Sequence, residues 1–296
     1  MGIKERLDKL DSNEGNLNSL YDIFREIHEI SIPIIRYTIS VGTPLIRMRI
    51  NDKGKDFTRI SDLSYPPSEC VREYGRANIP YNPMFYCCTF NVRFKEDAPY
   101  PRVVALLETS SFAREINCCG IERVTCSKWI PQRELNLVAL PYSSLYKRSN
   151  DDMNIIQQEW DRLKTLCDID KSGLELVEYM ADEIAKDYQC NIEYFKIAHF
   201  IYYLLNINPK TREADGILYP SVRAGGECFN IAIKPEVVDN HIIFEGASLC
   251  YLAKKFDQMH LEIINYSCLN DDSIEYIRIN NGLDDSPIFN NLEFIN

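Results

Sequence analysis

Residues 45–50 read Leu45-Ile46-Arg47-Met48-Arg49-Ile50, and this alternation decides how the surrounding sequence folds. Successive side chains of a strand point to opposite faces, so the pattern predicts a strand with Arg47 and Arg49 on one face and Met48 and Ile50 on the other. Two guanidinium groups on one face could bind a pyrophosphate through bidentate hydrogen bonds. A strand whose arginines face only solvent is the alternative, and these six residues alone favour it.

Further strands and helices are expected on both sides of this stretch. Apolar runs and alternating patterns predict strands over residues 84–90, 121–129, 135–140, 217–222, 229–233, 241–252 and 259–267. Helical spacing of apolar residues predicts helices over 13–31 and 101–117, and three more between 151 and 206, the first with Ile155, Ile156, Trp160 and Leu163 on its buried face. The pattern indicates an α+β protein in which a helical block interrupts the strands.

The domain organisation follows from the same pattern. We expect an N-terminal helical extension over residues 1–39 and a central domain over 40–235 with a helical insertion at about 151–206. A C-terminal β-rich extension over 236–296 is expected to pack on the same domain.

Composition limits the classes of partner. The chain has 33 basic and 44 acidic residues, a net charge of -11, and such a surface repels phosphate backbones and anionic membranes. We therefore expect no nucleic-acid partner. No run of about 20 apolar residues suggests a membrane span. The charged start lacks the apolar core of a signal peptide, and the eleven cysteines include no CxxC pair. A cytoplasmic protein with reduced thiols is the expectation.

The common catalytic and cofactor motifs are missing. The sequence contains no GxGxxG, no phosphate-binding P-loop, no GxSxG and no HExxH. Its four histidines are scattered without metal-ligand spacing, so no metal site is expected.

Polar residues in three further segments are candidates for a site. In Gly75-Arg76-Ala77-Asn78 a loop arginine and asparagine precede an aromatic strand, where Tyr86 could stack on a ligand or fill the core. Glu108 follows five apolar residues in a predicted helix and shares a face with Val104 and Ala105. A partly buried carboxylate needs a partner, and a structural arginine is the alternative to a catalytic role.

The third of these segments surrounds Ser221. Tyr219-Pro220-Ser221 ends a predicted strand, and Pro220 indicates a position at the sheet edge because proline donates no ladder hydrogen bond. Gly225-Gly226 indicates a tight turn or a close backbone approach to a ligand. Asn230 follows in the next predicted strand.

The order and texture of these segments resemble the RES-domain family, which is named for an arginine, a glutamate and a serine in this order. The matching residues are Arg47 in Ile-Arg-Met-Arg, Glu108 in Ala-Leu-Leu-Glu-Thr and Ser221 in Tyr-Pro-Ser-Val. Arg76-Ala77-Asn78 with Phe85-Tyr86, Trp129 and the stretch from Gly225-Gly226 to Asn230 add to the resemblance, which covers roughly residues 40–235.

The resemblance implies an ADP-ribosyltransferase-like fold, in which a split, curved β-sheet with flanking helices surrounds a nicotinamide-dinucleotide pocket. Members of the family are known as toxins that deplete NAD, often restrained by a helix-turn-helix antitoxin, and some transfer ADP-ribose to a protein. This chain is longer than the compact members and carries the helical block and a tail of about sixty residues beyond the motifs. These additions put the usual antitoxin arrangement in doubt.

The activity implied is cleavage of the nicotinamide–ribose bond of NAD by hydrolysis or phosphorolysis, with NAD as substrate and no further cofactor. Glu108 would stabilise the oxocarbenium-like transition state, and Ser221 would orient the ribose or Glu108 itself. Arg47 would bind the pyrophosphate. The other residues expected to contact the substrate are Arg49, Arg76, Asn78, Tyr86, Tyr219 and Asn230.

Two alternatives stay open at this point. The chain could transfer ADP-ribose to a macromolecule from the same pocket, or it could be a catalytically silent interaction protein on the same fold. Besides NAD, an antitoxin or immunity protein is a potential partner.

Overall fold

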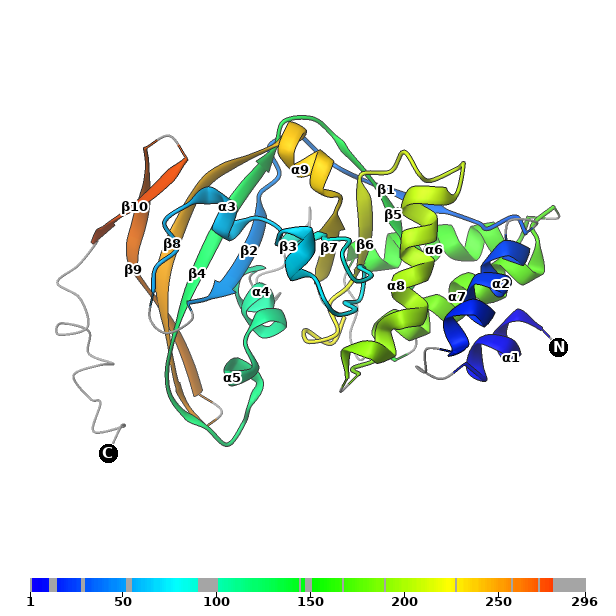
Figure 1. The fold of residues 1–296 in the computed structure, drawn as a ribbon, viewed down its shortest axis with the longest axis horizontal. Helices are drawn as coiled ribbons and strands as arrows, with labels where there is room; N and C mark the ends of the chain where they lie inside the picture. The colour runs from blue at the N-terminus through cyan, green and yellow to red at the C-terminus, as the bar shows by residue number, and fades with distance from the viewer. Residues whose placement is uncertain are drawn as a thin grey trace.

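A computed structural model describes residues 2–10, 15–27, 30–51, 55–89, 101–143, 145–146, 151–166, 168–188, 190–226, 228–256, 258–270 and 272–278 (Figure 1). Its helices are α1 (Ile3–Asp8), α2 (Gly15–Ile27), α3 (Ile60–Leu63), η2 (Ser68–Cys70), α4 (Pro101–Thr109), α5 (Ser111–Arg114), α6 (Asp151–Lys164), α7 (Lys171–Ala185), η3 (Asn191–Tyr194), α8 (Phe195–Tyr202), the π-helical η4 (Tyr203–Ile207) and α9 (Pro235–His241). Its strands are β1 (Ile35–Ile39), β2 (Leu45–Ile50), β3 (Phe85–Thr89), β4 (Cys119–Pro131), β5 (Leu135–Ala139), β6 (Gly216–Pro220), β7 (Phe229–Ile233), β8 (Ile242–Lys255), β9 (Gln258–Asn270) and β10 (Ser273–Arg278).

The described strands form one sheet, so the expected α+β class is confirmed. Its order is β1-β5-β6-β7-β3-β2-β4-β8-β9-β10. Neighbouring strands are antiparallel except β5 and β6, which are parallel. A parallel pair needs a long crossover connection, and the block from α6 to η4 supplies it. That block gathers with α1 and α2 at one end of the molecule (Figure 1). None of the described helices has the length and apolar character needed to span a membrane.

The sheet has a weak junction between β2 and β3, which we call the seam. The two strands pair only at Leu45 with Thr89 and at Ile46 with Cys88. Beyond Ile46, β2 pairs with β4 alone, and β3 pairs with β7 alone. The seam therefore separates β1, β5, β6, β7 and β3 from β2, β4, β8, β9 and β10.

The second half of the sheet curves strongly. The Ile274 backbone N–H donates to the Thr58 carbonyl at 2.8 Å, and the Ile60 N–H donates to the Asp272 carbonyl at 3.2 Å. The outermost strand β10 thereby meets the segment that leads into α3, and α3 lies over β2. Because α3 packs on β2, it lies beside the seam.

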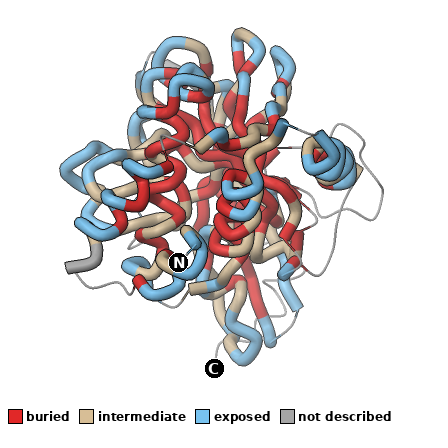
Figure 2. Tube along the Cα trace, turned by 90° about the vertical axis from the view of Figure 1, so that its right-hand side faces the viewer, coloured by how far each residue is buried: buried red, intermediate tan, exposed pale blue. Residues whose placement is uncertain are grey.

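The alternation predicted for residues 45–50 is confirmed. Met48 is buried in a small core under α4 with Val104, Cys126 and Leu252. Arg47 and Arg49 lie on the other face, where each donates a hydrogen bond to a carbonyl of α3. A larger core joins the remaining helices and strands, and Figure 2 shows the buried segments gathered at the centre of the molecule.

Three expectations about the elements are wrong. The helix expected over 101–117 is interrupted, because Ser110 ends α4 and its hydroxyl accepts from Ala113 N–H to cap α5. Ile155 is 47% exposed, because the phase of α6 turns Met153 inward in its place. Pro220 does not lie at a sheet edge: β6 is an interior strand, and it accommodates proline because Pro220 is its last residue.

The domain boundaries also need correction at one point. Residues 1–39 are not only helical, because β1 lies within them and pairs with β5 across five residues from Ile35 to Ile39. At the other end, β8 continues the sheet by pairing with β4. Both extensions thus share the sheet of the central segment.

Candidate active site

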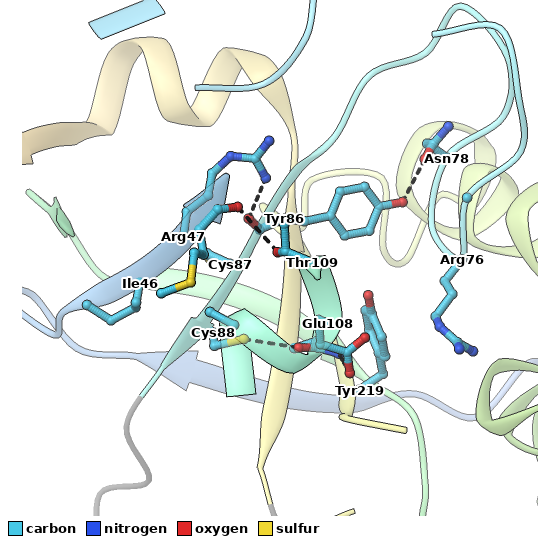
Figure 3. Close-up of a pocket in the computed structure, with 14 residues that line it drawn as sticks. Ile46, Arg47, Arg76, Asn78, Tyr86, Cys87, Cys88, Glu108, Thr109 and Tyr219 are labelled. Carbon is cyan, nitrogen blue, oxygen red and sulfur yellow. Dashed lines mark hydrogen bonds between the residues drawn. The ribbon is translucent and has the colours of Figure 1, made fainter. Parts of the chain in front are cut away.

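One cavity of about 240 Å³ collects most of the predicted site residues (Figure 3). It lies beside the seam, between β2, β3, α4 and the ends of β6 and β7. The predicted residues that line it are Arg47, Arg76, Asn78, Tyr86, Glu108, Tyr219 and Asn230. Ser221 reaches the site only through Glu108, and Arg49 is not among the lining residues.

Arg47 bridges the seam where the ladder between β2 and β3 stops. Its Nη1 donates to the Tyr86 carbonyl at 2.8 Å, and its Nε donates to the Leu63 carbonyl at 3.1 Å. The side chain thus hydrogen-bonds a β3 carbonyl at a position where β2 and β3 no longer pair. Burial, and secondarily the charge of Arg49, lower the pKa of Arg47 to about 10. The group therefore stays cationic at neutral pH. Within the described residues, its Nη2 has no hydrogen-bond partner.

Glu108 has one fixed and one open carboxylate oxygen. Oε1 accepts hydrogen bonds from Ser221 Oγ at 2.5 Å, Asn230 Nδ2 at 2.9 Å and the Arg223 backbone N–H at 3.4 Å. Oε2 accepts none from the described residues, and Glu108 lines the cavity. The partner expected for this carboxylate is therefore a set of neutral donors, and no described arginine forms an ion pair with it.

The turn after β6 places Ser221. Gly225 and Gly226 have φ values of 63° and 99°, in the left-handed region that glycine tolerates, so this prediction of a tight turn is confirmed. Their backbone N–H groups donate to Val222 and Ser221 carbonyls. The Ser221 hydroxyl accepts from Ala224 N–H at 3.1 Å and so has its proton available for Glu108.

A second chain of contacts runs through Cys88 and was not expected from the sequence. The Cys88 thiol donates to Asn230 Oδ1 at 3.1 Å, which leaves the Asn230 amide N–H to face Glu108. Burial raises the pKa of Cys88 well above its usual range, so the thiol keeps its proton and acts as a donor. The only sequence signal was its place two residues after Tyr86, on the same strand face.

Tyr86 and Asn78 form the opposite wall. The Tyr86 hydroxyl donates to Asn78 Oδ1 at 2.7 Å and accepts from Ala77 N–H at 3.0 Å. A side chain at Gly75 would collide with Asn78 Oδ1 and touch the Tyr86 hydroxyl, so this loop needs glycine there. Burial raises the pKa of Tyr86, which keeps the hydroxyl protonated.

Tyr219 offers a second hydroxyl to the cavity. The residue is 2% exposed, and burial raises the pKa of its phenol well above the usual range. Its hydroxyl has no hydrogen-bond partner within the part of the chain that the structure describes. A ligand in the cavity could therefore use this hydroxyl.

The other two predicted arginines hold the protein framework. Arg76 Nη1 donates to the Ile184 and Lys186 carbonyls, each at 2.6 Å, at the C-terminal end of α7. A cation is favoured there because the last carbonyls of a helix carry partial negative charge. Arg49 covers the Phe57 ring at 4.9 Å and donates to the Asp62 carbonyl. The helical insertion thus positions Arg76, and Arg49 fixes α3.

A second cavity of about 410 Å³ continues from the first. The two share Arg47, Gly75, Asn78 and Tyr86 as lining residues. Among the described residues, no group of three or more histidine, cysteine or acidic side chains could hold a metal ion. No protein-family model matches the chain, and no curated protein matches it.

Proposed function

We propose that this chain is an NAD-consuming enzyme of the RES-domain type, with an ADP-ribosyltransferase-like fold, that cleaves the nicotinamide–ribose bond. The observation that carries the proposal is the state of Glu108. Three donors fix its Oε1, while Oε2 remains open at a cavity that also contains Arg47.

A carboxylate held in this way suits the reaction. Nicotinamide leaves as a neutral base, and the ribose then carries the positive charge of an oxocarbenium-like transition state. A fixed negative group beside that charge stabilises it most when no reorganisation is needed. With water as acceptor, the C1′–N bond breaks and a C1′–O bond forms, giving nicotinamide, ADP-ribose and a proton. Phosphate as acceptor would give ADP-ribose 1-phosphate.

The shape of the site supports an elongated ligand. Cavities that bind small molecules usually measure about 300–1,000 Å³, and the cavity at Glu108 is smaller than this. Together with the adjoining cavity of about 410 Å³ it offers room for two nucleoside halves. Arg47 lines both cavities, which is where the pyrophosphate between the halves would bind.

The seam supports the finer fold assignment. A sheet that separates into two halves next to the site is what the resemblance to ADP-ribosyltransferases implies, and β2 and β3 diverge beside Arg47 in this way. We place the activity in the cytoplasm, since each cysteine whose state the structure describes is free. An antitoxin or immunity protein that covers the cavity is part of the same proposal.

The test is direct. Purified protein is incubated with NAD, with and without phosphate, and the nicotinamide and ADP-ribose products are separated by chromatography. Release of nicotinamide that Glu108→Gln abolishes supports the proposal. Release accompanied by ADP-ribose on a polypeptide would instead show a transferase, and no release at high enzyme concentration would identify a silent interaction protein.

A further inference from the structure

A cavity of about 360 Å³ in the helical block shares no lining residue with the cavity at Glu108. We call it the aromatic pocket, and it is defined by Tyr21, Phe24, Ile79, His199, Tyr203 and Ile207. Its walls come from α2, from the loop before β3 and from α8 with η4. Its volume suits a small organic molecule.

The aromatic side chains line a recess whose inner residues are more buried than those at its opening. Tyr21 and Ile207 are 45% and 44% exposed, whereas Phe24 and Tyr203 are almost fully buried. The Phe24 and Tyr203 rings are stacked with centroids 6.1 Å apart, and Tyr21 meets His199 edge-on at 5.4 Å. Flat aromatic rings at the wall favour a planar aromatic ligand.

His199 gives the recess a polar group. It is 5% exposed, and burial lowers its pKa to about 4, so the imidazole is neutral at pH 7. One ring nitrogen, Nε2, lies 3.3 Å from the Tyr74 hydroxyl. The other, Nδ1, has no hydrogen bond to any described residue. Because His199 lines the aromatic pocket, this nitrogen is available to pair with a ligand there.

The local backbone is also unusual. Tyr203–Ile207 is π-helical and supplies two of the residues that define the aromatic pocket. Such segments are rare and occur often at functional sites.

We infer that the aromatic pocket binds a neutral, planar nitrogen heterocycle of one or two rings, and that this binding changes the affinity of the neighbouring cavities for their ligand. The rings would stack against Phe24 and Tyr21, and a ring nitrogen would pair with His199. Arg25 at the rim, although paired with Asp22 at 3.0 Å, disfavours a cationic ligand.

The segment from Tyr74 to Ile79 connects the two sites. Tyr74 lines the cavity of about 410 Å³ and contacts His199. Ile79 lines the aromatic pocket, while its neighbour Asn78 accepts the hydrogen bond of Tyr86. A ligand that contacts Ile79 and His199 can therefore shift Asn78 and Tyr74, which line the cavity of about 410 Å³. This coupling rests on the proposed function, whereas binding of the heterocycle does not.

The binding test uses the full chain and benzimidazole, which offers both a donor and an acceptor nitrogen, in a calorimetric titration without NAD. We expect saturable binding with a Kd below about 1 mM. Ile207→Trp, which fills the mouth, and His199→Phe, which removes the ring nitrogens, should each weaken it at least about tenfold. Ile116→Trp is the matched control, since Ile116 is 66% exposed and lies outside the aromatic pocket.

Melting temperatures show whether each variant is folded, and Tyr21→Ala replaces any that is not. Absence of saturable binding, or equal affinity in the Ile207 variant and the control, overturns the inference. The coupling is measured as the affinity for ADP-ribose with and without saturating benzimidazole, and a change of about threefold or more is expected. An unchanged affinity overturns the coupling. Normal nicotinamide release with no benzimidazole binding refutes the aromatic pocket alone, and the opposite result refutes the proposed function alone.

Discussion

Ser221 donates a hydrogen bond of 2.5 Å to Glu108 Oε1, although 113 residues separate the two in the chain. The bond joins the turn after β6 to the last turn of α4. Because Ser221 is fully buried and touches only the oxygen that other donors also hold, the geometry favours a role in orienting Glu108 over a contact with ribose.

Replacing Glu108 with glutamine should separate catalysis from folding. The glutamine oxygen can accept the three hydrogen bonds that Oε1 accepts now, so the melting temperature should stay within a few degrees of wild type. The lost charge should lower kcat for nicotinamide release at least about 100-fold, which corresponds to about 2.7 kcal/mol of barrier. Glu115→Gln, at an exposed position nearby, is the control. An active but much less stable Glu108→Gln protein would make Glu108 a structural residue.

Ser221→Ala should have a smaller and different effect. Asn230 Nδ2 and the Arg223 N–H still donate to Oε1 after the change, so the carboxylate keeps two of its three hydrogen bonds and is held less firmly. We expect kcat to fall about tenfold with KM within about twofold, the pattern of a residue that acts in the transition state through another group. Ser221→Cys, which restores a weaker donor, should recover part of the rate. A rise in KM with unchanged kcat would instead indicate contact with the substrate.

Arg47 and Arg49 form a matched pair for testing phosphate binding. Arg47→Lys keeps the charge but loses the planar set of donors that serves the Tyr86 and Leu63 carbonyls and the cavity together. We expect its KM for NAD to rise about 30-fold, equivalent to about 2 kcal/mol, with a smaller change in kcat and a lower melting temperature. Arg49→Lys should leave KM within about twofold, because Arg49 does not line the cavity. Equal effects of the two changes on KM would remove the special role of Arg47.

Acidification should destabilise the protein through His199. Its folded pKa of about 4 lies below the value of about 6.5 expected in the unfolded chain, so the unfolded state binds the proton first. Stability is fully present above pH 6.5 and is lost as the pH falls toward 4. Between pH 7 and pH 5 the loss is at most about 2 kcal/mol. Urea unfolding at both pH values should show this loss in wild type but not in His199→Phe, after the shared losses from other groups are subtracted. An identical pH dependence in both proteins would contradict the assignment to His199.

Local patterns predicted much of the fold and of the site. Alternation in residues 45–50 predicted both faces of β2, and apolar spacing predicted the partial burial of Glu108 beside Val104 and Ala105, because each depends only on neighbours in the chain. The partners of these residues depend on pairing between distant strands. Cys88 contacts Asn230 because β3 and β7 pair in one particular register, which no local pattern reveals.

Arg76 is a second case in which local sequence did not predict the contacts of a side chain. Its position in a polar loop before an aromatic strand is compatible with binding phosphate. The structure nevertheless directs its Nη1 to the end of α7, more than a hundred residues further along the chain. A guanidinium group binds whichever oxygens the tertiary fold brings within reach, and residue type alone does not distinguish a ligand from a helix carbonyl.

The seam lies at the middle of the sheet, and the strands at the two margins, β1 and β10, are each separated from it by several others. At β1 a new strand would need backbone partners only from the strand at the margin, so the sheet can lengthen there without displacing Arg47, Tyr86 or Glu108. The β10 margin differs, because β10 already bonds the segment that leads into α3, and α3 holds Arg47. Variation in chain length can thus accumulate at the β1 margin while the centre keeps its geometry. For a protein engineer, the outer strand β1 is therefore the place to splice or attach sequence, and the residues beside the seam are those to leave untouched.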